Sequence, residues 1–152
     1  VSCDYCRTHF TCSQNDDLSP VLEKLKDKEI QGIILATPVY MGGMTSQAKA
    51  FLDRSVMFRR NGFYWKDRVG AALSIGGSRN GGQELAQTGI LSSFMIHDMV
   101  LVGDGSPSAH FGGTAWERVP GGPEKDDLAM DLIRNTGIRV AELALKLNQA
   151  DL

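Results

Sequence analysis

No stretch of this sequence approaches the run of about 18 apolar residues that a membrane-spanning helix requires. The N-terminus also lacks a basic region followed by an apolar segment, so no signal peptide is predicted. Charge of one sign is not in excess, because the formal net charge is −2, which argues against nucleic acid or an anionic membrane as a partner. With these classes excluded, the 152 residues are expected to form one cytoplasmic domain.

Cysteine is scarce and confined to one end of the chain. The three cysteines are Cys3, Cys6 and Cys12, and an odd count in a cytoplasmic chain favours metal or redox chemistry over a disulfide framework. The two-residue spacing between Cys3 and Cys6 lets both sulfurs face one metal centre. Two kinds of site fit: an iron–sulfur cluster, whose usual four ligands require one more cysteine, or a zinc site completed by His9. Inert thiols are the third interpretation.

Apolar residues follow two patterns along the chain, short unbroken runs and helical repeats. The unbroken runs predict strands, the first of them buried on both faces, at residues 30–36, 69–75 and 99–102. Helical periodicity predicts helices at residues 19–28, 45–58, 83–97 and 124–148. Strands that alternate with helices predict an α/β fold with a parallel sheet. Within this single domain, residues 1–17 form a cysteine-rich loop and residues 18–152 form the remainder.

In such folds ligands bind at the carboxyl ends of the strands, and each predicted strand ends in an unusual loop. The first loop consists of Thr37, Pro38, Val39, Tyr40, Met41, Gly42, Gly43 and Met44. Its proline stiffens the turn, and its tyrosine ring is available for stacking. The paired glycines let backbone N–H groups approach the polar edge of a ligand closely.

The second and third loops are also rich in glycine. The second contains Gly76, Gly77, Ser78, Arg79, Asn80, Gly81 and Gly82. A glycine-rich turn from strand to helix offers free N–H groups and a helix dipole to an anion, so a phosphate is one candidate ligand. The third loop, residues 103–113, is too long for a mere connection, and its candidate ligand contacts are Asp104, His110 and Phe111.

The first loop and the helix after it form one sequence motif that can be compared with those of known families. Thr-Pro-Val-Tyr, two glycines and Gln-x-Lys-x-Phe-x-Asp-Arg at residues 47–54 resemble the flavin loop of the flavodoxin-like FMN reductases. The Gly-Gly-Gln-Glu string at residues 81–84 is similar to the loop of that family beside the pyrimidine end of the flavin. The third loop and the cysteines resemble iron–sulfur flavoproteins. The cysteines match the last three of a Cys-x2-Cys-x2-Cys-x4–7-Cys motif, whose first cysteine would precede Val1.

The resemblance implies a flavodoxin-like three-layer α/β/α fold, with FMN at the three loops and a 4Fe–4S cluster on the three cysteines. It implies that electrons pass from a ferredoxin-like donor to an acceptor, in a homodimer or homotetramer that brings cofactors of neighbouring subunits close. It gives Arg79 the role of offsetting the negative charge near flavin N1 and O2 on reduction. It also predicts an N-terminal segment ahead of Val1, with the first strand, the FMN phosphate turn and the fourth cluster ligand.

Two other functions stay open. One is an NAD(P)H-dependent FMN or quinone reductase whose cysteines are incidental or bind zinc, and reduction of the flavin by NADPH would distinguish it. The other is a non-catalytic FMN- or zinc-binding module used for sensing or assembly. Turnover with any donor and acceptor faster than free FMN would exclude that module.

Overall fold

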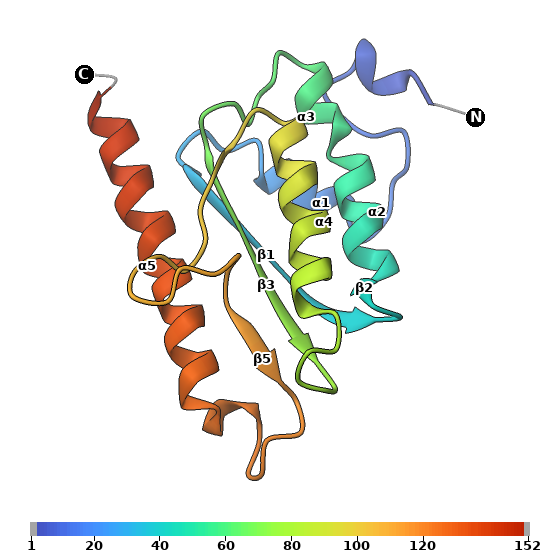
Figure 1. The fold of residues 1–152 in the computed structure, drawn as a ribbon. Coiled ribbons are helices and arrows are strands. Elements are labelled where there is room, and N and C mark those ends of the chain that lie inside the picture. The colour runs from blue at the N-terminus through green and yellow to red at the C-terminus, as the bar shows by residue number, and fades with distance from the viewer. Residues whose placement is uncertain (1–2, 151–152) are drawn as a thin grey trace.

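A mostly parallel sheet runs through the centre of the computed structural model, which describes residues 3–150 (Figure 1). The strands are β1 (Gly32–Tyr40), β2 (Gly43–Met44), β3 (Val69–Gly76), β4 (Val100–Leu101) and β5 (Thr114–Trp116). Their order is β2–β1–β3–β4, and β5 also pairs with β3. The parallel register of β1 and β3 runs from Gly32 opposite Val69 to Pro38 opposite Ile75, so both strands end at the same edge of the sheet. The predicted α/β fold is confirmed.

Helices cover both faces of this sheet, as the three-layer prediction requires (Figure 1). They are α1 (Ser19–Lys24), α2 (Ser46–Arg54), α3 (Val56–Arg60), α4 (Gln83–Ile96) and α5 (Asp127–Ala150), with short 3-10 turns η1 (Tyr5–Arg7) and η2 (Pro123–Lys125). On one face, α4 and its neighbours enclose a core around Trp65 and Phe58, both fully buried. On the other face, Val140 of α5 packs against Val69 and Ala71 of β3. Within residues 3–150 no helix has the length and apolar character needed to cross a membrane.

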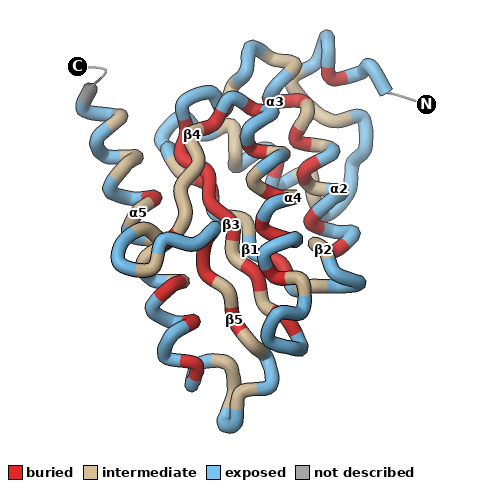
Figure 2. The backbone as a smooth tube through the Cα atoms, viewed as in Figure 1, coloured by how far each residue is buried: buried red, intermediate tan, exposed pale blue. Residues whose placement is uncertain are grey.

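Most residues of β3 are buried, whereas buried residues of β1 alternate with less buried and exposed ones (Figure 2). The prediction that β1 is buried on both faces is wrong. Ile33 and Thr37 are buried on the α4 side, but Ile34 and Ala36 are exposed. The reason is that the opposite face is only partly covered by α5, which leaves a 420 Å³ apolar cavity against the ends of β1 and β3. The expected strand ahead of Val1 finds no support in the described residues and stays a prediction.

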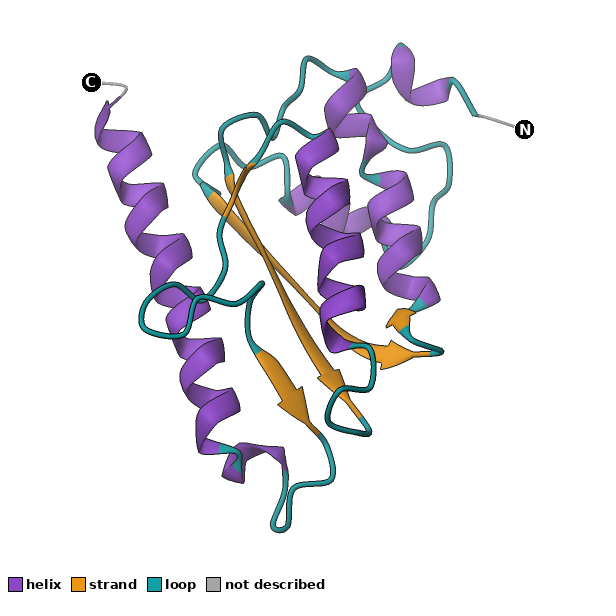
Figure 3. Cartoon of the chain, in the orientation of Figure 1, coloured by secondary structure: helices purple, strands orange, loops and turns teal. Residues whose placement is uncertain are grey.

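Several predicted boundaries need correction. The first loop is not a loop throughout, because β1 continues to Tyr40 and pairs antiparallel with β2, so the sheet is not purely parallel. The predicted strand at residues 99–102 shrinks to β4, and the long loop after it contains β5 (Figure 3). The helix expected at residues 45–58 divides at Ser55 into α2 and α3. The last helix begins at Asp127, because η2 forms a separate turn before it.

His97 directly follows α4 and turns its ring into the core. The ring is 3% exposed, and its Nε2 lies 2.8 Å from the Ser55 hydroxyl at the junction of α2 and α3. Burial, with a smaller contribution from the Arg59 charge, lowers the pKa of His97 to about 4. The neutral imidazole therefore joins α4 to the bend between α2 and α3.

Stability should fall as the pH drops from about 6.5 toward 4. An unfolded histidine takes up a proton near pH 6.5, whereas folded His97 does so only near 4, so the unfolded state binds more protons in this window. The loss is at most about 3 kcal/mol. Urea unfolding at several pH values measures it, and His97→Gln should flatten the dependence between these limits. An equally steep dependence in the variant would contradict this assignment.

Candidate functional site

The first loop is a β-hairpin with a two-residue turn. Val39 pairs with Met44 and Tyr40 with Gly43, so Met41 and Gly42 form the turn. Both turn residues have positive φ, 51° and 79°, as a type I′ turn requires. The side chains of Tyr40 and Met41 project into solvent, 64% and 105% exposed. The sequence therefore builds a projecting apolar tip at the carboxyl end of β1.

A buried threonine fixes this hairpin to the start of α2. The Thr45 amide donates to the hydroxyl of Thr37, which is 3% exposed, at 3.1 Å. Thr45 is also the N-cap of α2, because its hydroxyl accepts a hydrogen bond from the Ala48 amide at 3.1 Å. Thr37 is thus a predicted site residue whose role in the structure is to hold the loop.

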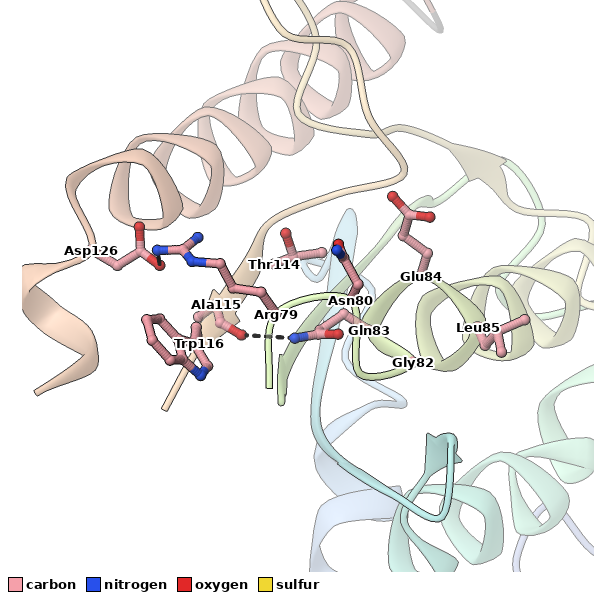
Figure 4. Close-up of a pocket in the computed structure, with 10 residues that line it drawn as sticks. All are labelled: Arg79, Asn80, Gly82, Gln83, Glu84, Leu85, Thr114, Ala115, Trp116 and Asp126. Carbon is pink, nitrogen blue, oxygen red and sulfur yellow. Dashed lines mark hydrogen bonds and ion pairs between the residues drawn. The ribbon is translucent and has the colours of Figure 1, made fainter. Parts of the chain in front are cut away.

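The second loop is closed by the side chain of Gln83, which the sequence analysis had not singled out as a site residue. Its Oε1 accepts from the Gly81 amide at 2.7 Å, and its Nε2 donates to the Ser78 carbonyl at 2.6 Å. A third bond, at 3.4 Å, reaches the Ala115 carbonyl of β5 (Figure 4). The sequence did contain a signal for Gln83, since this residue directly follows Gly81 and Gly82. Its amide sets the loop conformation and joins it to the sheet.

The first and second loops contact each other at two glycines, Gly42 and Gly82. Gly82 has φ +105°, and a Cβ built on it would lie 2.9 Å from the Gly42 Cα atom. Where β1 and β3 end, a 200 Å³ cavity is lined by Pro38, Val39, Tyr40, Ile75, Gly76, Gly77 and Glu117. Pro38 and Ile75 also line the 420 Å³ apolar cavity on the α5 side. The two cavities thus adjoin at the carboxyl ends of β1 and β3, and we call them together the strand-end groove.

Arg79 lies apart from the strand-end groove. Its guanidinium forms an ion pair with the buried Asp126 at 3.4 Å and lies 4.9 Å from the centre of the Trp116 ring. These side chains surround a separate cavity of 340 Å³ (Figure 4). The role predicted for Arg79 at the flavin edge stays a prediction, because in this conformation its charge is directed at Asp126.

Asp104 organises the third loop from within. Its carboxylate is 1% exposed and accepts hydrogen bonds from the Ser108 hydroxyl and the His110 amide. Burial opposes ionisation, but these hydrogen bonds outweigh it and lower the pKa of Asp104 below its ordinary value. Neither Asp104 nor His110 lines the strand-end groove. The structure does not bring these two predicted residues to the other two loops.

All three cysteines line one cavity of 530 Å³, between the N-terminal loop and α2 and α3. Cys6 is buried, Cys12 half-buried and Cys3 exposed. The Ser13 hydroxyl, 3.4 Å from the Cys3 sulfur, lowers the pKa of that thiol. We call this the cysteine cavity. Spacing grouped Cys3 with Cys6, and the resemblance to iron–sulfur flavoproteins added Cys12, which is separated from Cys6 by five residues.

Two arginines that the sequence analysis did not assign complete the wall of the cysteine cavity. Arg60 donates to the Cys6 sulfur at 3.3 Å and to the Cys3 carbonyl at 2.8 Å. The bond to Cys6 raises the pKa of Arg60. Arg54 donates to both carboxylate oxygens of Asp16, at 2.8 and 2.6 Å. Arg54 is the last residue of the Gln-x-Lys-x-Phe-x-Asp-Arg string at residues 47–54. Membership of this string was the only feature of the sequence that pointed to Arg54.

The cysteine cavity suits a cluster better than a single ion. Among residues 3–150 no three cysteine, histidine or acidic side chains converge closely enough to hold one metal ion. His9, the proposed zinc ligand, stacks on Tyr5 with ring centres 4.1 Å apart and does not line the cavity. The buried Nε of Arg54 has no partner among the described atoms, as expected beside an anionic group that would occupy this space. An iron–sulfur cluster held by thiolates matches these features.

The hairpin of β1 and β2 leads into the start of α2 (Figure 1), and Asp53 and Arg54 at the other end of this helix line the cysteine cavity. Thr45 caps the helix beside the hairpin, and Arg54 ends it in the wall of the cysteine cavity. Nine helical residues span about 13 Å. A mostly parallel sheet flanked by helices on both faces is the architecture of a flavodoxin-like protein.

Comparison with known proteins gives the family. The profile of the NADPH-dependent FMN reductases matches residues 2–114, so the chain belongs to that family. An iron–sulfur flavoprotein of Methanocaldococcus jannaschii is 43% identical over 94% of this chain and 72% of its own length. An iron–sulfur flavoprotein of Methanosarcina thermophila is 42% identical over 93% of this chain and 70% of its own length. The crystal structure of a WrbA-like flavodoxin from Agrobacterium tumefaciens shares 25% identity. It superposes with a TM-score of 0.62 over 76% of this chain and 67% of its own.

Proposed function

We propose that this protein transfers electrons, with FMN in the strand-end groove and an iron–sulfur cluster in the cysteine cavity. The observation that carries the proposal is that three cysteines lining one cavity lie next to two arginines, at the far end of a helix that starts beside the groove. Similarity to iron–sulfur flavoproteins supports both cofactors. We further propose the 4Fe–4S form, a ferredoxin-like donor and a homodimer or homotetramer.

The hairpin next to the strand-end groove leaves room for a flat aromatic ligand. The space around Gly42 and Gly43 is open, since a Cβ on either would meet nothing within 4 Å. A ring can therefore approach the hairpin backbone closely. The apolar wall around Pro38 and Ile75 excludes water from one side. FMN supplies one- and two-electron redox chemistry when bound, and the chain positions it and sets its surroundings.

In the cysteine cavity, Cys3, Cys6 and Cys12 would provide thiolate ligands. A cluster supplies single-electron chemistry when bound. The fourth ligand is proposed to come from a residue ahead of Val1, as the sequence resemblance implies. Arg54 and Arg60 bring positive charge to a site where thiolates gather negative charge.

The first test is an anaerobic purification followed by a visible spectrum, with iron, acid-labile sulfide, zinc and FMN measured on the same sample. Flavin bands over broad absorption near 400 nm, with about four iron per chain, are expected. Flavin with zinc or without metal would contradict the cluster. Cluster absorption without flavin would contradict the role of the groove.

A second function is favoured by the family match, which is to NADPH-dependent FMN reductases. In that case NAD(P)H, not a ferredoxin-like protein, would reduce the flavin. Stopped-flow mixing with NADPH separates the two. Fast and saturable bleaching of the flavin would establish the reductase, and an unchanged flavin spectrum would exclude it.

A further inference from the structure

The two arginines of the cysteine cavity are unusually well covered for cations. The side chains of Arg54 and Arg60 are only 14% and 19% exposed. Charged side chains are mostly exposed, and covering one is costly unless a specific partner compensates the loss of water. The question is therefore which anionic partners the cysteine cavity offers them.

Arg60 is directed at the cysteine loop. Its Nη1 donates to the Cys6 sulfur and to the Cys3 carbonyl, at 3.3 and 2.8 Å. The nearest carboxylate is Asp4, 3.6 Å from Nη2, and that side chain is 63% exposed. A sulfur atom is therefore the best-covered acceptor that Arg60 contacts.

Only some of the N–H groups of the Arg54 guanidinium have acceptors. Nη1 binds Asp16 and Nη2 donates to the Gln14 carbonyl at 3.2 Å. Its Nε is buried with no partner among the described atoms. Asp53, a carboxylate that lines the cavity, is bound by Lys49 at 2.5 Å. A buried N–H without an acceptor is unfavourable, so this donor calls for an acceptor inside the cavity.

We propose that Arg54 and Arg60 are positioning residues that raise the one-electron reduction potential of the cluster in the cysteine cavity. This inference rests on the proposed function, because it requires a cluster at Cys3, Cys6 and Cys12. Arg60 acts through its hydrogen bond to the Cys6 sulfur, and Arg54 acts through its charge and its unpartnered Nε–H.

The physical reason is the change in charge on reduction. One electron passes from a ferredoxin-like donor, which is oxidised, to the cluster, which is reduced and becomes more negative by one unit. Cations covered from water interact more strongly with that added charge than exposed ones do. Hydrogen bonds to the sulfurs and the surrounding charge are among the factors that set cluster potentials. Both arginines therefore favour the reduced form.

Arg54→Gln and Arg60→Gln test the proposal by potentiometric titration under anaerobic conditions, with dithionite as reductant and the reduced cluster followed by electron paramagnetic resonance. Each variant should have a more negative potential than the wild type. At a fixed solution potential, the ratio of reduced to oxidised cluster should fall at least about tenfold, which corresponds to 59 mV for one electron. Arg60→Lys keeps the charge but loses the planar donor group, so it should recover only part of the shift.

Arg59→Gln is the matched control, because Arg59 is the neighbouring residue of α3 and its side chain is exposed over Phe63, not in the cavity. Its potential should equal that of the wild type. Unchanged potentials in Arg54→Gln and Arg60→Gln, with iron and sulfide retained, would overturn the inference. Should a glutamine variant lose its iron, Arg54→Lys and Arg60→Lys decide instead, and wild-type potentials in both would overturn the inference. A wild type without iron and sulfide would refute the proposed function itself, which is a separate result.

Discussion

Replacing Cys6 by serine should remove most of the iron and acid-labile sulfide while FMN stays bound. Cys6 is the one buried cysteine of the three and is already oriented by Arg60 and by the Asn61 side chain, which donates to its carbonyl at 3.0 Å. A hydroxyl at this position is a poor ligand for iron, because clusters are held by thiolates. We expect at least about a tenfold loss of iron per chain, which corresponds to about 1.4 kcal/mol or more of binding free energy.

The measurement is iron and sulfide content against FMN content in the same anaerobic preparation. Ser13→Ala is the matched control, since it removes the hydroxyl beside Cys3 but no sulfur. That control should keep its iron. Full iron content in Cys6→Ser would contradict the assignment of Cys6 as a ligand, and parallel loss of FMN would indicate general unfolding instead.

Replacing Gly82 by alanine should weaken FMN binding at least about tenfold, or about 1.4 kcal/mol. The new Cβ would lie 2.9 Å from the Gly42 Cα atom and 3.0 Å from its carbonyl oxygen. Two costs add: the left-handed backbone at φ +105° and the close contact between the two loops. Together they amount to about 2–5 kcal/mol. Because the contact is between backbone atoms, the loops must separate, and the strand-end groove changes shape.

Quenching of FMN fluorescence on titration with protein gives the dissociation constants. Gly137→Ala supplies the control, since it adds the same methyl group to α5 where nothing lies within 4 Å. It should bind FMN normally and gain up to about 1 kcal/mol in unfolding free energy from helix propensity. Wild-type affinity in Gly82→Ala would show that the contact of the two loops does not shape the flavin site.

The sequence predicted those features that depend on neighbouring residues. The central strand β3 and the helix α4 have strong apolar patterns, and their observed bounds differ from the predicted ones by one residue. The grouping of Cys3 with Cys6 followed from their spacing, and that of Cys12 followed from the family resemblance. In contrast, β5 has three residues and no periodicity of its own, because it forms only by pairing with Ser74–Gly76 of β3.

The role of the two arginines in the cysteine cavity also depends on contacts distant in sequence, so it could not be predicted. Arg54 and Arg60 lie near the ends of α2 and α3, where a basic side chain is usually solvated. They become covered only because the N-terminal loop folds across them, which brings Asp16 and Cys6 from 38 and 54 positions away. Similarly, the split at Ser55 reflects its contact with His97, 42 positions later.

The outer edge of β3 has a consequence for solubility. β4 pairs with its beginning and β5 with its end, so the middle of this edge has no strand beside it. The loop between them covers this gap, because Gly112 lies against the Ala72 carbonyl. Where the pairing with β5 begins, the Ser74 amide donates to the Gly113 carbonyl at 3.0 Å. A strand from another molecule would find no free row of N–H and C=O groups to extend along this edge. The loop thus protects the most buried strand of the sheet from edge-to-edge aggregation.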